Sequence, residues 1–512
     1  MSELAGKEWV RIRVQAEELA IGEIERSGEK VVEAPEVQSQ SCEFRLERCI
    51  EAREQGGYLE VKFPVPERTE RIEVSYTVQT QDKGQSVIDL GVRDEARMRG
   101  WSGGARTGFA IGLHRATPGY IAGAIAPGEW AVVLGTHRVA PEGCTVQIDV
   151  RLQIAKPRWL CGDLHLHTEH SDGVFTVEET IQLARRAGLD FIALTDHNAV
   201  SQNESSGWRD GLLLIPGMEL TTGRGHCNLY GVADPLRDFR AVTADQLKER
   251  LAEARAAGAY ISLNHPHDAA CGWHWGFDVD HDWVEIWNGS WSGANARTLA
   301  WWQDQLTAGR RITAIAGSDT HRPHPYVRHG WPTAWVFAEG NSAEQILKAV
   351  DQGRVTLSYA PDGPFVVISC GGVMMGGEWK ESRDGKMDGE IGGELDEELD
   401  RVQDEVPYRK LNEELGGDMG VKQDEEMHVN AKLNGGQPVL RLQMKRLAAG
   451  DEVRLWSDRG QEYAITAEAD GEMDLERELP LRRFWRAEVW RAMEEAGGQK
   501  RLVAATNPVY FG

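Results

Sequence analysis

The chain has 512 residues, 41% of them apolar and 27% charged, which is an ordinary globular composition in a chain too long for one hydrophobic core. A net charge of −24 opposes non-specific binding to nucleic acid or to anionic membranes. Because the sequence shows no signal-peptide core, no run of about 20 apolar residues and no CxxC pair among its seven cysteines, we expect a cytoplasmic protein of two or three domains with free thiols.

Residues 1 to about 157 contain short alternating or apolar runs, separated by turn residues such as those at 141–143. Five of these runs are predicted strands: Val10–Val14, Arg71–Val78, Ser86–Val92, Trp130–Gly135 and Thr145–Ile154. Since few helical periods occur between them, this region is predicted to be an N-terminal β-sandwich domain, 1–157.

From residue 158 the pattern changes to alternating helices and strands. Thr176-Val-Glu-Glu179 is a capping box, and it predicts a helix that ends at Gly188. The same pattern predicts helix starts at Thr243 and Ser342, and Trp301–Ala308 also has helical character. Strands are predicted between them at Phe191–Leu194, Leu212–Ile215, Tyr260–Leu263 and Ile312–Ala316. This alternation implies a parallel sheet or barrel, an α/β domain over 158–365.

The third region, 366–512, begins with an acidic and glycine-rich stretch. Between 376 and 430 there are 18 acidic and 7 basic residues, which predicts a solvated, partly disordered insertion. We expect the strands that follow to form a small C-terminal β-domain: Pro438–Met444, Glu452–Trp456 and Arg483–Arg491.

Histidines and carboxylates gather in the middle region, where 12 of the 15 histidines lie between residues 165 and 329. They follow five predicted strands: Asp163, His165 and His167; Asp196, His197 and Asn198; Glu219 and His226; Asn264 and His265; Asp319 and His321. Alternate residues of a strand face one side, so we expect Asp163, His165 and His167 to point together. Functional groups collect at strand ends in parallel α/β folds, and five such ends predict a metal site.

The types of ligand limit the choice of metal. Imidazoles and carboxylates without paired thiolates suit zinc, manganese or iron, and they disfavour a structural zinc site made of cysteines. Cys161 and Cys227 lie near the predicted ligands in sequence, and we expect both to be small buried apolar residues.

These motifs resemble those of the PHP family, named for polymerase and histidinol phosphatase domains. The matching pieces occur in the family's order: Asp163-Leu-His-Leu-His167-Thr with Ser171-Asp-Gly173, Thr195-Asp-His-Asn198, Glu219, Gly225-His226, Asn264-His-Pro266 and Ser318-Asp-Thr-His321. The resemblance covers roughly 158–365 and implies a distorted (β/α)7 barrel flanked by the two β-domains. A looser resemblance to the CehA/McbA-like branch rests on Gly100-Trp-Ser-Gly-Gly104, Thr117-Pro-Gly-Tyr120 and Thr506-Asn-Pro-Val-Tyr510.

The resemblance also implies how two or three divalent ions share the ligands. The first ion takes His165, His167, Glu219 and Asp319; the second shares Glu219 and adds His226 and His265; the third takes Asp172, His197 and His321. Asp172 stands where some members place a histidine. Glu219, Asp319 and His321 are expected to act in catalysis, with Asp319 accepting the proton of the attacking water.

Residues around the motifs are candidates for support and for substrate binding. Asp163, Asp196 and Asn198 are expected to orient the ligands. Arg224 and Arg322 sit beside ligand motifs and are expected to meet phosphate oxygens. Three histidines are candidates to protonate a leaving group: His267, His274 and His324. Seven tryptophans between 273 and 302 are interpreted mostly as core, with some able to stack on a base or an aromatic leaving group.

Phosphoester hydrolysis is the expected function, on a small phosphomonoester, a nucleoside bisphosphate or an oligonucleotide end. No stable nucleic-acid complex and no membrane association are expected, and the oligomeric state is left open. Hydrolysis of a carbamate, amide or carboxylic ester is the alternative enzyme activity, because a tryptophan-lined pocket would suit an aromatic ester. A third possibility is a metal-stabilised scaffold without catalysis, whose β-domains bind a partner.

Overall fold

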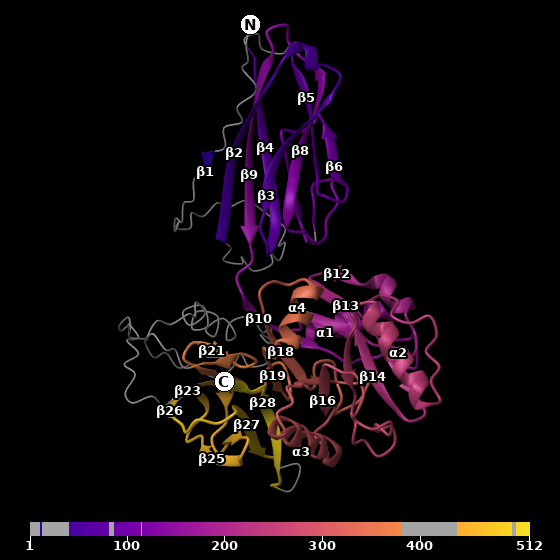
Figure 1. Ribbon diagram of the computed structural model, residues 1–512, viewed down its shortest axis with the longest axis vertical. Coiled ribbons are helices and arrows are strands. Elements are labelled where there is room, and N and C mark those ends of the chain that lie inside the picture. The colour runs from indigo at the N-terminus through magenta and orange to yellow at the C-terminus, as the bar shows by residue number, and fades with distance from the viewer. Residues whose placement is uncertain (1–10, 13–39, 81–85, 114, 381–437, 494–497) are drawn as a thin grey trace, which may run out of the picture. The chain divides into compact units, whose positions relative to one another are not determined.

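The computed structural model describes residues 11–12, 40–80, 86–113, 115–380, 438–493 and 498–512. Two compact units divide the chain, Met1–Pro157 and Arg158–Gly512, and Figure 1 labels their elements. Within these described ranges, no helix is both long and apolar enough to cross a membrane.

The first unit contains two antiparallel sheets, one of five strands in the order β1-β2-β9-β4-β7 and one of four in the order β3-β8-β5-β6. The five strands are β1 Arg11–Ile12, β2 Gln40–Ile50, β9 Cys144–Ile154, β4 Thr69–Gln79 and β7 Gly108–Gly112. The four strands are β3 Tyr58–Val65, β8 Gly128–Arg138, β5 Val87–Arg93 and β6 Met98–Gly103. The predicted strand Val10–Val14 lies partly outside the described residues, and its described part is β1.

The two sheets of the first unit enclose one apolar core. Side chains along β9 alternate between buried and more exposed positions, as expected for a strand with one face in a core. The core takes Val146 and Ile148 from β9, and it takes Leu90 and Val132 from the other sheet. The described part of this unit is therefore a β-sandwich, built from the turn-bounded runs of the sequence.

The second unit is built on a mixed sheet of 16 strands, whose main path runs β17-β16-β15-β14-β13-β11-β10-β18-β19-β28-β27-β24-β25. The strands before residue 366 are β10 Arg158–Asp163, β11 Phe191–Leu194, β12 Gly207–Arg209, β13 Leu212–Thr222, β14 Gly225–Tyr230, β15 Tyr260–Leu263, β16 Trp283–Asn288, β17 Thr313–Gly317, β18 Thr333–Ala338 and β19 Val355–Ser358. Strands β11 and β17 are buried along their whole length, which explains why they form continuous apolar runs in the sequence.

The hydrogen bonds between strands do not confirm the expected (β/α)7 barrel. The sheet is an open path, and the segments beyond β10 and β17 meet through an isolated bridge between Leu166 and Thr320 rather than through a ladder. Strand directions are also mixed, because β14 is antiparallel to both β13 and β15. Only Gly223 and Arg224 connect β13 to β14, too few residues for the crossover helix that a parallel pair requires. The unit is a mixed α/β structure with, among the described residues, four α-helices.

Three of these helices begin at the capping boxes that the sequence predicts. They are α1 Val177–Arg186, α2 Ala244–Ala256 and α4 Ala343–Asp351, and their first turns are capped by the hydroxyl oxygens of Thr176, Thr243 and Ser342. A glycine with positive φ follows each helix: Gly188 at 78°, Gly258 at 94° and Gly353 at 71°. The fourth helix, α3 Gly293–Thr307, starts well before the predicted Trp301. Ser292 caps its first turn, but the reciprocal side-chain contact of a capping box is missing, so the sequence pattern did not indicate this start.

Strands after residue 365 extend the same sheet and add another. They are β20 Phe365–Cys370, β21 Val373–Met374, β22 Glu378–Trp379, β23 Val439–Leu447, β24 Glu452–Ser457, β25 Gly460–Thr466, β26 Gly471–Glu478, β27 Phe484–Ala492, β28 Lys500–Thr506 and β29 Val509–Phe511. Because β28 pairs with β19, strands from both sides of the predicted boundary at 365 share one sheet, and that boundary stays a prediction. Most of the predicted acidic insertion, 376–430, lies outside the described residues.

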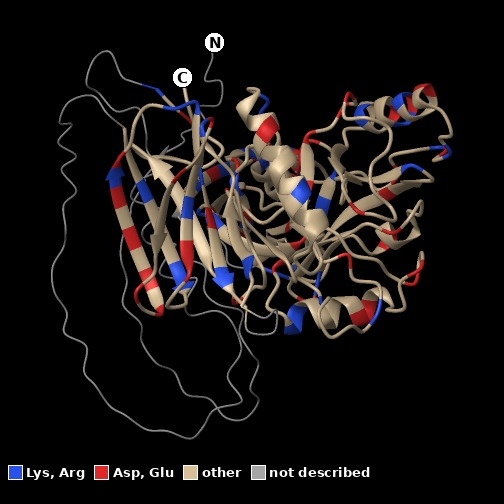
Figure 2. Ribbon diagram, turned by 90° about the horizontal axis from the view of Figure 1, so that it is seen from below, with Lys and Arg blue, Asp and Glu red and all other residues tan. Residues whose placement is uncertain are grey.

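Basic and acidic residues are interspersed along the strands of this second unit (Figure 2). Arg441 on β23, for example, lies 3.9 Å from carboxylate oxygens of Asp474 and of Glu476 on β26. Beneath this polar surface, buried apolar clusters cover both faces of the main sheet. One includes Leu247 of α2 and Trp302 of α3, and the other includes Ile181 of α1 together with C-terminal strands. The close packing of these two clusters therefore fixes the positions of the strand ends.

Candidate metal centre

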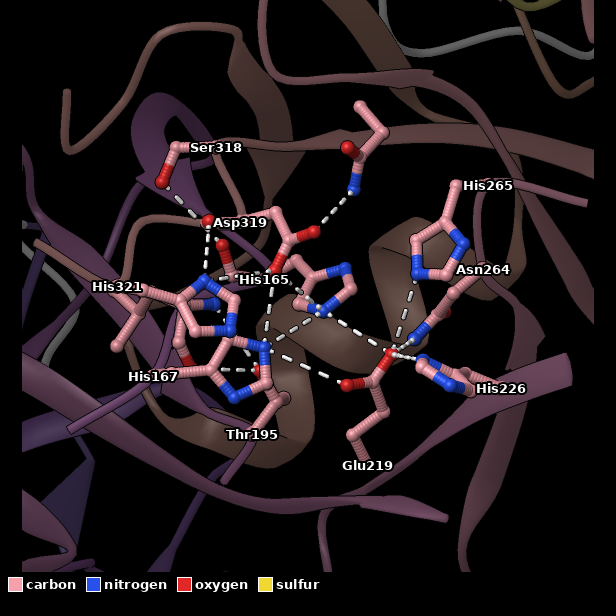
Figure 3. Close-up of polar contacts among 12 residues, drawn as sticks. His165, His167, Thr195, Glu219, His226, Asn264, His265, Ser318, Asp319 and His321 are labelled. Atoms are coloured by element: carbon pink, nitrogen blue, oxygen red, sulfur yellow. Dashed lines mark hydrogen bonds and ion pairs between the residues drawn. The ribbon is translucent and has the colours of Figure 1, made fainter. Parts of the chain in front are cut away.

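Five imidazole rings surround the carboxylate of Glu219, which lies fully buried on β13. Figure 3 labels four of these histidines, His165, His167, His226 and His265. The Oε1 atom of Glu219 is 3.3 Å from His165 Nε2, 3.3 Å from His226 Nδ1 and 3.5 Å from His265 Nε2. Its Oε2 atom is 2.6 Å from His197 Nδ1 and 3.5 Å from His167 Nε2. Two oxygens of one carboxylate thus face two different sets of histidines, which suits a carboxylate that bridges two ions.

Asp319 faces the same histidines from the end of β17. Its Oδ1 atom lies 3.0 Å from His167 Nε2 and 3.4 Å from His165 Nε2, and these two ring nitrogens are 3.2 Å apart. The side chain of Asp319 is 23% exposed, whereas that of Glu219 is 0% exposed. Asp319 therefore stands between the buried ligands and solvent.

A third group of ligands lies nearer the surface. Asp172 Oδ1 is 3.3 Å from His321 Nε2 and 3.7 Å from His197 Nε2, and the ring of His167 stacks against both of these histidine rings. The side chain of Asp172 is 57% exposed. All nine predicted ligands fall into overlapping groups whose donor atoms lie within 4.8 Å of one another.

The backbone around these ligands is unusual. Strand β10 ends at Asp163, so the alternation expected to carry Asp163, His165 and His167 on one face does not extend to the two histidines. Asp163 instead accepts hydrogen bonds from the backbone N–H groups of His165, Ser318 and Gly330, and so ties three segments together. His265 and Asp319 have positive φ values of 30° and 52°, a conformation that only a strongly determined site imposes on such residues.

The donor set fits divalent cations. Glu219 Oε2, Asp319 Oδ1 and His226 Nδ1 are buried, and none has a well-formed hydrogen bond, although ring nitrogens lie close to both carboxylate oxygens. A buried carboxylate oxygen without a donor costs free energy unless a cation compensates it. Four overlapping groups of histidine and carboxylate, two of which share Glu219, are the arrangement expected of a polynuclear metal site.

The electrostatics of the centre favour charged carboxylates. Burial alone would raise the pKa of Glu219, but the neighbouring histidines, His165 first, outweigh it and hold that pKa well below its usual range. The pKa of Asp319 is likewise held well below its usual range, where burial is outweighed by His165 and His167. Burial raises the pKa of Asp163 to about 6 in spite of its backbone hydrogen bonds. The centre is thus an anionic pocket lined by imidazoles.

Two of the predicted supporting residues hold loops behind the ligands. Asp196 accepts hydrogen bonds from the backbone and hydroxyl of Thr168 and from the hydroxyl of Ser171, next to Asp172. The Asn198 side chain donates to the carbonyl of Thr221 and accepts from its N–H, which fixes β13 two residues after Glu219. Asp196 and Asn198 therefore fix the backbone segments that carry the predicted ligands Asp172 and Glu219.

The sequence reasoning missed several polar residues of the centre. Glu285 on β16 places Oε1 2.9 Å from His165 Nδ1, and Asn264 Nδ2 donates to Glu219 Oε1 over 2.8 Å. Cys271 Sγ lies 3.5 Å from His265 Nδ1. One signal was available for Glu285, since it is a single carboxylate inside the apolar run Trp283–Trp287.

The predicted substrate-binding residues are more scattered. The guanidinium of Arg224 lies 4.5 Å from the ring centre of Trp275 and donates to the carbonyl of His274. The exposed Arg322 directly follows the ligand His321. His267 stacks on Phe277 with its Nδ1 atom 3.2 Å from the hydroxyl oxygen of Thr298. His324 is exposed, and its Nδ1 atom accepts backbone N–H groups of its own loop.

The cysteines and tryptophans of the centre are largely structural. All seven cysteines lie in described parts of the chain and are free, and Cys161 and Cys227 are buried as expected. The seven tryptophans from 273 to 302 are buried in, or packed against, one apolar cluster. Trp275 additionally donates from Nε1 to the Thr222 hydroxyl, which holds it beneath Arg224.

Comparison with known proteins places the centre in context. Residues 163–263 match the model of the PHP domain family. A segment of 106 residues is 31% identical to a 3′,5′-nucleoside bisphosphate phosphatase of Chromobacterium violaceum, covering 19% of this chain and 37% of that protein. A segment of 115 residues is 28% identical to a 5′-3′ exoribonuclease of Haemophilus influenzae, covering 19% of this chain and 42% of that protein. The chain thus matches less than half the length of each relative.

Among solved structures, the chain is similar to a two-domain protein of Bacteroides vulgatus that contains a predicted PHP-like metal-dependent phosphoesterase. The likeness covers 68% of this chain and 95% of that one, with 17% identity and a TM-score of 0.34. These comparisons concern the PHP domain, and the CehA/McbA-like branch stays a prediction.

Proposed function

We propose that this chain, which carries a PHP domain in residues 163–263, is a metal-dependent phosphoesterase. The observation that carries the proposal is the convergence of six histidines and three carboxylates into overlapping groups around Glu219. A centre that holds several cations side by side suits a substrate whose reacting group is a tetrahedral oxyanion.

We assign the ions as the resemblance to the PHP family implies. His165, His167, Glu219 and Asp319 would hold one ion, Glu219 with His226 and His265 a second, and Asp172, His197 and His321 a third. The groups of donor atoms in the structure overlap these sets without coinciding with them, since His265 also groups with His165 and Asp319, and His226 with His197 and Glu219. When bound, manganese, zinc or iron at such a centre lowers the pKa of a water toward ~7 and offsets negative charge on phosphoryl oxygens. Glu219 would be the ligand common to the first and second ions, because its Oε1 atom lies 3.3 Å from both His165 Nε2 and His226 Nδ1.

The protein's own groups then determine the geometry of attack. Asp319 is the ligand carboxylate placed to take the proton of the attacking water, because it lies beside buried His167 and yet is partly open to solvent. His321 donates from Nδ1 to the carbonyl of Asp319, so its Nε2 atom turns toward Asp172 at the open side. The hydrogen bonds of Asp163 to the backbone next to Asp319 hold that segment in place.

The proposed substrate class rests on two arginines near the centre and on the names of the two curated relatives. The two curated relatives are named for a nucleoside bisphosphate and for RNA, both of them phosphate esters. Arg224, held flat on Trp275, would meet a phosphate oxygen at the rim, and Arg322 beside His321 would meet another. We therefore propose a small phosphomonoester, a nucleoside bisphosphate or an oligonucleotide end as substrate. The net charge of −24 supports an enzyme that forms no stable nucleic-acid complex. Its free thiols support a reducing compartment such as the cytoplasm.

Release of phosphate from a substrate panel tests the proposal. Protein loaded anaerobically with manganese, zinc or iron is incubated with nucleoside bisphosphates, short oligonucleotides and simple phosphomonoesters. Release of inorganic phosphate is measured from the monoesters and bisphosphates, and release of mononucleotides is measured from the oligonucleotides. His265→Ala is the inactive reference, and the exposed Glu178→Gln on α1 is a control for substitution itself. Phosphate release by the wild type and the control alone is expected, and release no greater than that of His265→Ala would reject the proposal.

The same panel separates the alternative activity. Aryl carbamates, amides and carboxylic esters are included because tryptophans pack close to the centre. Hydrolysis of these compounds without any phosphate release would select the alternative hydrolase, and no turnover of either class would favour a non-catalytic scaffold.

A further inference from the structure

Glu285 is a buried carboxylate to which the sequence motifs assign no role. It lies on β16 among Val284, Ile286 and Trp287, and its side chain is 1% exposed. A bulge in the pairing of β16 with β17 falls between Glu285 and Trp287. Bulges of this kind re-aim a side chain, and a buried carboxylate is retained only where it has partners.

The partners of Glu285 all belong to the metal centre. Its Oε1 atom lies 2.9 Å from His165 Nδ1, and its Oε2 atom accepts the backbone N–H of His265 over 3.0 Å. Oε2 also accepts from Asn288 Nδ2 over 3.1 Å, and the same Nδ2 reaches Asp319 Oδ2 at 3.3 Å. His165, His265 and Asp319 form one of the groups able to hold an ion, so Glu285 contacts two of its members directly and the third through Asn288.

The contact with Glu285 also determines which nitrogen of the His165 ring carries the proton. A carboxylate only accepts hydrogen bonds, so Nδ1 of His165 carries the proton and Nε2 is left free to be a ligand. Nε2 is the atom that faces Glu219 and Asp319, at 3.3 and 3.4 Å. Gly317 leaves the space for this contact, since a Cβ there would come within 2.2 Å of the His165 Cβ atom and 2.9 Å of Glu285 Oε1.

We propose that Glu285 is a positioning residue that couples two ions of the centre, because the His165 ring that it holds belongs to two groups of potential ligands, one with His265 and Asp319 and one with His167 and Glu219. The inference rests on the proposed metal centre but not on the identity of any substrate. Its consequence is that neutralising Glu285 weakens the binding of at least two ions together. By contrast, loss of the outlying ligand Asp172 removes only one.

The Glu285→Gln substitution tests this role with little change in volume. If its carbonyl oxygen faces His165, its NH2 group confronts the N–H of His265 and the amide of Asn288, which are also donors. If the amide is flipped, its NH2 group forces Nδ1 of His165 to accept and places the ring proton on the ligand atom Nε2. Either orientation breaks one set of contacts, so we expect the affinity for two ions to fall by about 10- to 100-fold.

Glu488→Gln is the matched control. Glu488 is also 1% exposed, but it pairs with Arg486 and Trp490 on β27, among residues that hold no predicted ligand. Both variants are expected to lower the unfolding temperature, because each neutralises a buried paired carboxylate. Only Glu285→Gln is expected to change metal affinity.

Metal affinity is measured by competition of Mn²⁺ with a chelator, and metal content is measured after dialysis, so no substrate is required. A Glu285→Gln protein with wild-type affinity and content, and with a loss of stability like that of Glu488→Gln, would overturn the proposal. Loss of one ion only, as for Asp172→Asn, would also overturn the coupling. If Glu285→Gln does not fold, Asn288→Ala decides, since a fall of several fold in affinity is expected from the lost link to Asp319 and an unchanged affinity would reject the role.

Discussion

Oε1 of Glu285 lies 2.9 Å from Nδ1 of His165, although the two residues are 120 positions apart in the chain. The contact joins β16 to the segment that follows β10, which are not neighbours in the sheet. Together with the three backbone bonds of Asp163, it holds the inner histidines from behind while their ligand atoms face Glu219 and Asp319. The centre is therefore rigid on its buried side and open near Asp172.

Replacing Glu219 by glutamine is expected to abolish function. The amide keeps the shape but cannot bridge two cations, and it leaves five histidines around a neutral group. Outer partners of metal ligands cost about 10- to 100-fold when removed, so loss of this ligand should cost more than about 100-fold in phosphate release. Metal content per chain should fall in parallel. Wild-type metal content in Glu219→Gln would show that Glu219 is not the shared ligand.

Asp172→Asn is expected to affect the outer ion alone. Its carboxylate is the most exposed of the ligands and meets only His197 and His321, so the buried clusters stay complete without it. Metal analysis should show one ion fewer than in the wild type, with an unchanged unfolding temperature of the chelated protein. A variant that loses every ion would contradict the separation of the outer group from the inner ones.

Gly317→Ala is expected to be destabilising and to weaken metal binding. The added Cβ would lie 2.2 Å from the Cβ of His165, and overpacking of this kind costs about 1–3 kcal/mol. Denaturant unfolding measures the loss of stability, and chelator competition measures the loss of affinity. Gly223→Ala is the control, because nothing lies within 4 Å of a Cβ built at Gly223. Equal behaviour of the two variants would mean that His165 can move without consequence.

His329 is expected to make stability depend on pH. Burial lowers its pKa from 6.5 to about 4, and it packs edge-on against Phe175. Between these values the unfolded chain binds more protons than the folded one, so stability rises with pH from about 4 to 6.5 and falls as the solution is acidified. At about 1.4 kcal/mol per pKa unit, the wild type should lose about 3 kcal/mol over that window through this group.

The His329→Leu variant should lose this part of the pH dependence. Unfolding is measured with chelator present at each pH, so that release of bound ions does not contribute. A variant whose stability changes with pH as steeply as that of the wild type would show that His329 is not buried in its neutral form.

Helix ends and strand cores of the second unit were predictable from the sequence because they depend on local chemistry. The capping residues Thr176, Thr243 and Ser342 act within one turn, and the strand Tyr260–Leu263 is an uninterrupted buried run. The (β/α)7 barrel was not confirmed by the hydrogen bonds, because a barrel depends on how strands pair. Nothing in the local pattern signalled that β14 returns antiparallel after a two-residue connection.

The centre shows the same division. The nine predicted ligands come together because each follows a recognisable motif, and the structure adds the contacts that make them a cluster. Glu285 and Cys271 lie outside the motifs, and the motif that contains Asn264 assigned that residue no role. The contacts of Glu285 with His165 and of Asn264 with Glu219 join segments distant in the chain. The roles of Arg322 and His324 in substrate binding stay predictions, because such contacts depend on a ligand rather than on the fold.

Metal analysis of the purified protein, prepared without air, tests the central claim most directly. Two or three divalent ions per chain are predicted in the wild type, with a marked loss in Glu219→Gln. At a free metal concentration of about 100 times the Kd, each bound ion should stabilise the fold by about 2.7 kcal/mol. One ion or none per chain, unchanged by the substitution, would contradict a polynuclear centre built around Glu219.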